Sequence, residues 1–130
     1  MAEQQKTAAP TTIEQLLGTE AREPKTALVR FRDHPTADGS PLTFRIRELS
    51  YNQVAEIKRS TADSALRTVL MGVAAPSFKE LAESLNLPSP FDAIKRILSA
   101  GEIDELQVEI EKLSGFRRKL SEVVEDIEKN

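Results

Sequence analysis

The segment from Gly101 to Phe116 places the strongest constraint on the fold, because it has the clearest helical pattern in the chain. Apolar residues recur in it at spacings of three and four, which puts them on one side of a helix. These residues are Ile103, Leu106, Ile110 and Leu113. Acidic residues crowd the first turn, where they suit the positive end of the helix dipole, and Gly115 is suited to ending the helix. The sequence therefore predicts a helix that buries one side in a domain.

The length of 130 residues suits one compact domain. We expect a flexible tail over residues 1–10 and a single domain over residues 11–130. Aromatic residues make up only 5% of the chain and charged residues 30%, so the predicted core is small and aliphatic under a charged surface. Because no apolar run approaches the length of a membrane span and the first residues lack a signal-peptide pattern, we expect a soluble, intracellular protein.

A short helix is predicted after the tail. Two residue pairs, Thr11 with Glu14 and Thr12 with Gln15, have the spacing of a capping box, and Gly18 ends the segment. The apolar residues of this helix are Ile13, Leu16 and Leu17. So short a helix is unstable alone in water, so we expect it to dock on the domain or on a partner.

Two alternating runs, at residues 28–32 and 42–47, flank a turn-rich segment and predict a β-hairpin at about residues 27–47. The apolar face of the hairpin carries Val29, Phe31, Phe44 and Ile46. The opposite face carries Arg30, Arg32, Arg45 and Arg47. Because a hairpin alone is marginally stable, we expect its apolar face to pack on a helix.

Serine residues mark the starts of further short helices. Ser50 precedes a helix that runs from Tyr51 to about Arg59, and Ser77 and Ser89 each precede a brief one. Residues 63–73 have helical spacing, although they could form a buried strand; we favour the helix.

A last helix is predicted after Phe116. Its apolar side consists of Leu120, Val123, Val124 and Ile127. This side either closes the core or contacts another chain. With five or six short helices packed against one N-terminal hairpin, the predicted fold class is α+β, mainly α.

The residue types that perform catalysis are scarce in this chain. Cysteine is absent, which excludes disulfides, thiolate metal sites and cysteine nucleophiles. The one histidine, His34, falls in the predicted turn, and we expect it to be exposed and without a chemical role. The acidic residues from Glu102 to Glu111 are expected to be ordinary surface. We therefore predict no enzyme and no catalytic, cofactor or metal site.

The four arginines of the hairpin ask for an explanation, because like charges on neighbouring positions across a strand pair repel each other. One interpretation makes them a docking surface for an acidic protein partner or, less readily, for a phosphate backbone. The other is that charged residues keep an edge strand from pairing with neighbouring molecules. No aromatic residues lie between the arginines, as base stacking would require, so nucleic-acid binding is disfavoured.

Several segments occur in an order typical of one protein family. They are L-L-G at residues 16–18, F-R-I-R-E-L-S-Y-N-Q-V at 44–54, V-A-A-P-S-F at 73–78, I-L-S-A-G-E-I-D-E-L at 97–106, I-E-K-L-S-G-F at 110–116 and a final K-N. From about residue 13 to residue 130 the chain resembles the XkdN-like tail assembly chaperones of contractile-tailed phages and phage-like particles. The most specific parts are G-E-I-x-E-L and L-S-G-F.

The resemblance implies a non-catalytic protein of the host cytoplasm. Such a protein engages the tape measure protein during tail assembly, keeps it soluble, helps recruit tail tube subunits and is absent from the mature particle. It also implies association with a longer, frameshifted form of the same chain, and leaves self-association open. The partner-binding candidates are the four hairpin arginines together with Leu120, Val123, Val124 and Ile127.

Two other functions compete with this one. A structural tail or baseplate accessory would remain in the finished particle. A small nucleic-acid-associated regulator would use the hairpin arginines, and its binding would weaken steeply with salt.

Overall fold

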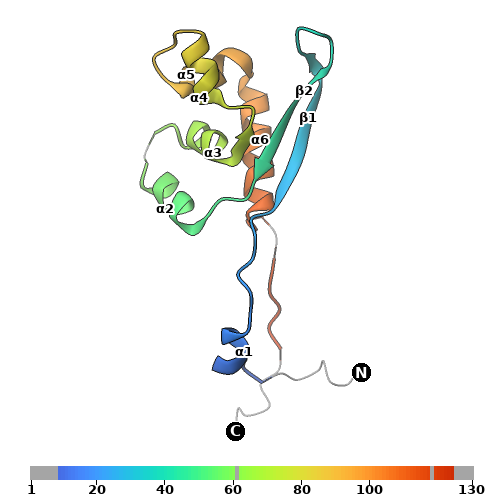
Figure 1. Cartoon of the computed structure of the whole chain (residues 1–130), viewed down its shortest axis with the longest axis vertical. Helices are drawn as coiled ribbons and strands as arrows, with labels where there is room; N and C mark the ends of the chain where they lie inside the picture. Colours follow the sequence, from blue (N-terminus) through green and yellow to red (C-terminus); the bar gives the residue numbers. More distant parts are fainter. Residues whose placement is uncertain (1–8, 61, 118, 125–130) are drawn as a thin grey trace. The chain divides into compact units, whose positions relative to one another are not determined.

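The protein is described by a computed structural model, which covers residues 9–60, 62–117 and 119–124 (Figure 1). The chain divides into two compact units. The larger unit, residues 24–118, is called the body below; the smaller one combines residues 1–23 with 119–130. The prediction of a single domain over residues 11–130 stays a prediction.

The body contains the predicted hairpin, formed by β1 (Thr26–Pro35) and β2 (Pro41–Arg47). In the described residues a third strand, β3 (Val73–Ala75), pairs with the other edge of β2, so the sheet order is β1-β2-β3 and both pairs are antiparallel. The third strand was not predicted, because three residues carry too little alternation to be recognised. Its position makes β2 the central strand.

Five helices follow the hairpin in the described part of the body: α2 (Tyr51–Arg59), α3 (Ser64–Gly72), α4 (Phe78–Ser84), α5 (Pro90–Ile97) and α6 (Ala100–Leu113). The helix favoured for residues 63–73 is confirmed for all but its ends. The α+β fold class, with a hairpin against short helices, is confirmed as well.

Ser50 and Ser77 cap α2 and α4 as predicted, whereas the cap that Ser99 forms on α6 was not predicted. Helix α3 begins after Asp63, which makes no side-chain cap hydrogen bond. Ser50 and Ser99 form capping boxes at the starts of α2 and α6, and the Ser77 hydroxyl accepts a hydrogen bond from a backbone N–H of α4. Ser89 stands at the start of α5, but its hydroxyl donates to the Asp92 carboxylate over 3.1 Å and not to the backbone.

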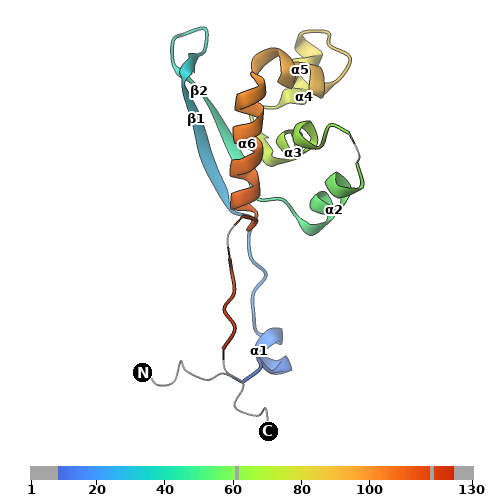
Figure 2. The same cartoon turned by 180° about the vertical axis from the view of Figure 1, so that it is seen from behind.

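The helix α6 lies between the sheet and the other helices (Figures 1 and 2). It contacts β1 and β2 on one side and α3 on the other. Leu106 and Ile110, at the centre of its predicted apolar side, are both 0% exposed. After α6, Gly115 adopts a φ of +94°, the left-handed conformation predicted for the residue that ends this helix.

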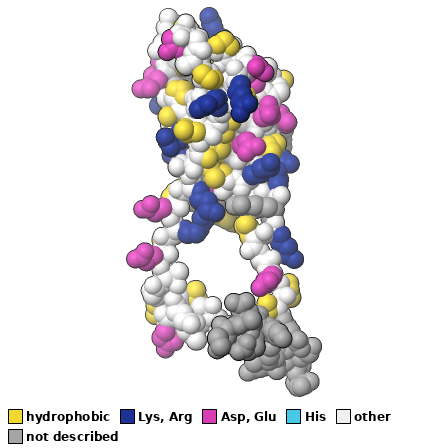
Figure 3. All heavy atoms as spheres, turned by 90° about the vertical axis from the view of Figure 1, so that its right-hand side faces the viewer, with side chains coloured by type: hydrophobic (Ala, Val, Ile, Leu, Met, Phe, Trp, Pro, Cys, Tyr) yellow, Lys and Arg dark blue, Asp and Glu magenta, His cyan; other side chains and the backbone are white. Residues whose placement is uncertain are grey.

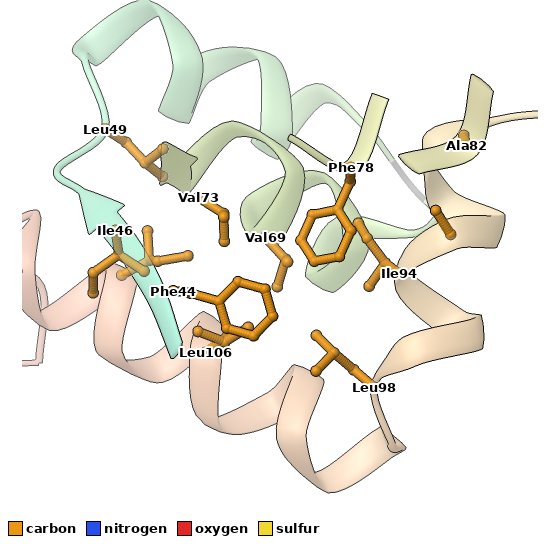
Figure 4. Packing of buried hydrophobic residues seen from close by; sticks show 12 residues of the cluster. Phe44, Ile46, Leu49, Val69, Val73, Phe78, Ala82, Ile94, Leu98 and Leu106 are labelled. Carbon is orange, nitrogen blue, oxygen red and sulfur yellow. The ribbon is translucent and has the colours of Figure 1, made fainter. Parts of the chain in front are cut away.

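The core forms where the apolar face of the hairpin meets α3, α4, α5 and α6 (Figure 4). The ring of Phe44 stacks on that of Phe78, with the ring centroids 5.6 Å apart. The ring of Phe31 meets the Phe44 ring edge-on, with the centroids 6.2 Å apart. All four hairpin residues predicted to face the core do so, with Phe44 and Ile46 fully buried. Three of the six aromatic residues of the chain thus meet at one place in the core.

Within the smaller unit, α1 (Ile13–Leu17) is capped by Thr12, whose backbone N–H donates to the Gln15 side chain over 2.8 Å. The second of the two predicted capping pairs is therefore the one used. The three apolar side chains of α1 are all largely exposed.

The helix predicted after Phe116 is wrong for the residues that the structure describes there, because residues 119–124 have no helical conformation. The basic run at residues 117–119 would stand at the N-terminal end of such a helix, where positive charge opposes the dipole, and it offers no capping side chain. Ile127 and residues 1–8 of the predicted flexible tail lie outside the described residues.

Candidate functional site

The four hairpin arginines lie on the face of the sheet opposite α6, and all four are exposed. The register separates them: Arg45 stands opposite Leu28, Arg30 opposite Thr43, and Arg47 opposite Thr26. No two arginines are direct cross-strand neighbours in the described pairs, so the repulsion expected from the sequence is weaker than predicted. We call this surface, with Arg30, Arg32, Arg45 and Arg47, the arginine face.

The guanidinium groups of the arginine face are available to a partner. Within the described ranges, none of the four makes an ion pair with a carboxylate. The edge-protection interpretation explains at most the two arginines of β1, because β2 is paired on both sides and is not an edge strand. Figure 3 faces the side of the body where the hairpin lies in Figure 1 and shows Lys and Arg side chains in dark blue beside Asp and Glu in magenta.

A second surface is an apolar groove of about 290 Å³ between α2, α3 and the segment after α6. Its lining residues are Leu49, Val54, Ile57, Lys58, Thr68, Glu111, Phe116 and Arg117. We call it the α2–α6 groove. No pattern in the sequence predicted this groove, because it forms between segments far apart in the chain.

The Ser114 hydroxyl, next to this groove in the sequence, joins Leu49 of its lining to the end of α6. Its oxygen accepts a hydrogen bond from the backbone N–H of Leu49 over 2.9 Å, and the hydroxyl donates to the Ile110 carbonyl over 2.7 Å. This pair of bonds ties the segment that enters α2 to the end of α6. Beyond it, the turn at Gly115 leads to Phe116, which is 43% exposed in the groove wall.

The rim of the groove is basic. The ammonium group of Lys58 lies 5.9 Å from the centre of the Phe116 ring, within the range of a cation–π contact. Glu111 is half-buried and is bound by Arg117 through contacts of 2.6 and 2.7 Å. It is therefore not the ordinary surface residue that was expected, and its charge is balanced.

His34 is also not the exposed turn residue that was predicted. Strand β1 continues to Pro35, so His34 is half-buried, and its Nδ1 lies 2.9 Å from the Glu102 carboxylate at the start of α6. Burial raises the pKa of Glu102, but hydrogen bonds from the Ser99 backbone N–H and from His34 outweigh it, so the net pKa is lowered. This pair joins the hairpin to α6 and suits a structural role.

The turn itself is held by Asp38. Its carboxylate accepts hydrogen bonds from the hydroxyls of Ser40 and Thr36, at 2.6 and 2.7 Å, and from the Ser40 backbone N–H at 3.0 Å. These donors, the Ser40 hydroxyl first, hold the pKa of Asp38 well below its usual range. These hydrogen bonds order the turn and occupy the Asp38 carboxylate, which suits a structural role.

The described ranges contain no cluster of three or more side chains that could hold a metal ion. Every helix in those ranges is too short or too polar to cross a lipid bilayer. Two surfaces of the body, the arginine face and the α2–α6 groove, are suited to contact with another molecule.

The other partner-binding candidates lie in the smaller unit. Leu120 and Val123 are 70% and 92% exposed, whereas Val124 is half-buried. They do not share one side of a helix, because the described segment around them is not helical. Their role in partner binding stays a prediction, as does that of Ile127.

Comparisons with known proteins bear on function and fold separately. A family described as phage XkdN-like tail assembly chaperone proteins matches residues 61–128. No curated protein matches the sequence. Among solved structures, the chain is similar to a crystal structure described as that of the protein YqbN, with 19% identity and a TM-score of 0.64. The similarity covers 83% of this chain and 99% of that one, and at this identity it shows the fold alone.

Proposed function

Because this chain belongs to the family of XkdN-like phage tail assembly chaperones, we propose that it binds the tape measure protein and keeps it soluble during tail assembly. In the same proposal it is non-catalytic, helps recruit tail tube subunits, acts in the host cytoplasm and is absent from the mature particle. The observation that carries the proposal is the family match over residues 61–128. Two exposed binding surfaces on one small body are consistent with it.

The arginine face is the proposed docking surface for an acidic stretch of the partner. Four exposed guanidinium groups without carboxylate partners in the described residues favour this role, because Arg binds carboxylates through paired, charge-assisted hydrogen bonds. In the smaller unit, the exposed side chains of Leu120 and Val123 are proposed to add a second contact, together with Val124 and Ile127.

Co-expression with the tape measure protein tests the function. The expected result is that the tape measure protein stays in the soluble fraction and elutes with this chain, whereas expressed alone it precipitates. Precipitation in both cases, with no complex on size-exclusion chromatography, would contradict the proposal.

A fourfold variant tests the arginine face. Changing Arg30, Arg32, Arg45 and Arg47 to Gln is expected to weaken the complex and leave the melting temperature nearly unchanged, because all four side chains are exposed. The matched control changes Lys79, Lys95, Arg96 and Lys112, which are also exposed, to Gln. Equal weakening by both variants would show that total charge and not the arginine face is responsible.

The two competing functions predict different results. A structural accessory would be found by mass spectrometry in purified mature particles, where a chaperone is expected to be absent. A nucleic-acid-associated regulator would bind DNA or RNA with an affinity that falls steeply with salt and is lost in the fourfold arginine variant.

A further inference from the structure

We propose that the α2–α6 groove binds an amphipathic helix whose apolar side chains fill the groove and whose flank carries carboxylates beside Lys58. The inference deepens the proposed function, on which it rests, since it states which part of a tape measure protein the chaperone holds.

The helix α2 has an apolar side that the body only partly covers. Val54 and Ile57 lie one turn apart on this side, and both are half-buried in the groove wall. No residue of α2, all of which the structure describes, is fully buried. Since apolar helix surface is stabilised by removal from water, this side of α2 favours a further apolar contact.

The groove lining suits aliphatic side chains better than a polar small molecule. Leu49 and Phe116 add apolar surface to that of α2. The Thr68 hydroxyl already donates to the Ser64 carbonyl over 2.9 Å, and Glu111 is already bound by Arg117. Small-molecule sites orient their ligands with a few precisely placed polar groups, and these groups of the lining are occupied by partners within the body.

The size of the groove fits part of a helix. Its volume of about 290 Å³ holds a few side chains and not a whole element. Side chains at positions i and i+3 or i+4 of a helix lie about 5–6 Å apart and point the same way, so they can enter one groove together. Recognition of amphipathic helices by apolar grooves uses this spacing.

The positive charge at the rim of the groove favours a bound helix that carries negative charges beside its apolar side. Lys58 is exposed and, among the residues that the structure describes, has no carboxylate partner, while the one acidic residue of the lining is neutralised by Arg117. A helix with carboxylates beside its apolar side chains places them near this ammonium group. A helix flanked by lysines is repelled instead.

The test uses the full chain and two synthetic peptides. Both carry leucines at helical spacing on an alanine background; one is flanked by glutamates and the other by lysines. In an NMR titration, the glutamate peptide is expected to shift resonances of residues 49–58 and 111–117. We expect it to bind at least about tenfold more tightly than the lysine peptide at low salt.

Three single variants connect the binding to the groove. Phe116→Ser should weaken binding of the glutamate peptide. Lys58→Glu should reverse the preference, so that the lysine peptide binds more tightly than the glutamate peptide. Leu28→Ser is the matched control, because Leu28 is 60% exposed on the arginine face and does not line the groove. If Phe116→Ser lowers the melting temperature, Lys58→Glu alone decides, since its side chain is exposed and any change in preference reflects charge.

Several outcomes would overturn the inference: peptide shifts confined to residues 28–47, an unchanged preference in Lys58→Glu, or equal weakening by Leu28→Ser. Co-expression separates this failure from failure of the proposed function. If Phe116→Ser and Lys58→Glu keep the tape measure protein soluble as well as the parent does, the groove inference fails and the function stands. If the parent does not keep it soluble but binds the glutamate peptide in the groove, the function fails and the groove inference stands.

Discussion

Leu106 shows what burial does to a single residue in this protein. It is 0% exposed and packs in the core formed by the hairpin and the helices (Figure 4). Leu106→Asp is expected to unfold the body, because an uncompensated buried charge costs about 3–5 kcal/mol and total stability is about 5–15 kcal/mol. Circular dichroism melts measure the loss.

The control for this substitution is Leu28→Asp, whose parent side chain is 60% exposed on the arginine face. Surface substitutions of this kind change stability by less than about 0.5 kcal/mol. If the melting curve of Leu106→Asp matches that of the parent, the Leu106 side chain is not buried in the core.

A second prediction at this scale concerns Glu102. Because its pKa is lower in the folded chain than in the unfolded chain, its carboxylate stabilises the fold above its ordinary pKa, and this contribution is lost as the pH falls through the lowered value. Glu102→Gln can still cap α6 but loses the charge beside His34. We expect it to be less stable than the parent by up to about 1 kcal/mol at pH 7, with a smaller difference in acid.

Urea unfolding of the parent and of Glu102→Gln at a series of pH values between neutral and acid measures this difference. A gap between the two proteins that stays constant over the whole series would argue against the carboxylate as its source. His34→Ala is a useful companion, because it removes the same contact from the other side.

At the scale of secondary-structure elements, α3 and α6 approach each other closely at Gly72. A Cβ atom built on Gly72 would lie 2.6 Å from two side-chain atoms of Ile110, which is itself 0% exposed and has little room to move. Gly72→Ala should therefore destabilise the body by about 1–3 kcal/mol, although alanine favours helix over glycine by about 1 kcal/mol.

Gly101→Ala is the matched control, because nothing lies within 4 Å of its Cβ position near the start of α6. It is expected to leave stability unchanged or to raise it by up to about 1 kcal/mol. If Gly72→Ala and Gly101→Ala raise the free energy of unfolding in urea equally, α3 and α6 are farther apart at Gly72 than described.

The connection between α2 and α6 gives another prediction at this scale. Ser114→Ala removes the acceptor for the Leu49 backbone N–H and should cost about 1–3 kcal/mol, because that partly buried donor loses its partner. Relative to the parent, Ser114→Ala should then accelerate amide hydrogen exchange more in α2 than in α4 and α5. Uniform acceleration over the whole body would indicate a general loss of stability instead.

At the scale of the whole molecule, the two proposed binding surfaces should respond differently to salt. Screening shortens the range of charge interactions from about 8 Å at physiological ionic strength to about 3 Å at 1 M salt. Contacts of the arginine face should therefore weaken strongly, while apolar contacts in the α2–α6 groove persist. Titrations of the tape measure complex at increasing salt measure both contributions.

The fourfold arginine variant provides the control for that experiment. If the arginine face carries the electrostatic contact, this variant should lose most of the salt dependence and retain the apolar part. A complex of the parent chain that is insensitive to salt would contradict a role for the arginine face in binding.

The sequence by itself was enough to predict the α+β class, the hairpin, the serine-capped helices and the buried side of α6. These features depend on local physics, since helical spacing, strand alternation and caps are each specified within a few residues. The same local patterns identified the arginine face. They failed at residues 119–124, where apolar spacing suggested a helix that unfavourable charges at its start oppose.

Only the tertiary structure decided the features that join distant segments. Strand β3 exists because β2 offers an unpaired edge, and His34 acquires a role because β1 brings it to Glu102. The α2–α6 groove likewise requires Leu49, Thr68 and Phe116 to meet in space. Contacts of this kind depend on how elements pack and not on the pattern within any one of them, so no reading of local spacing could have predicted them.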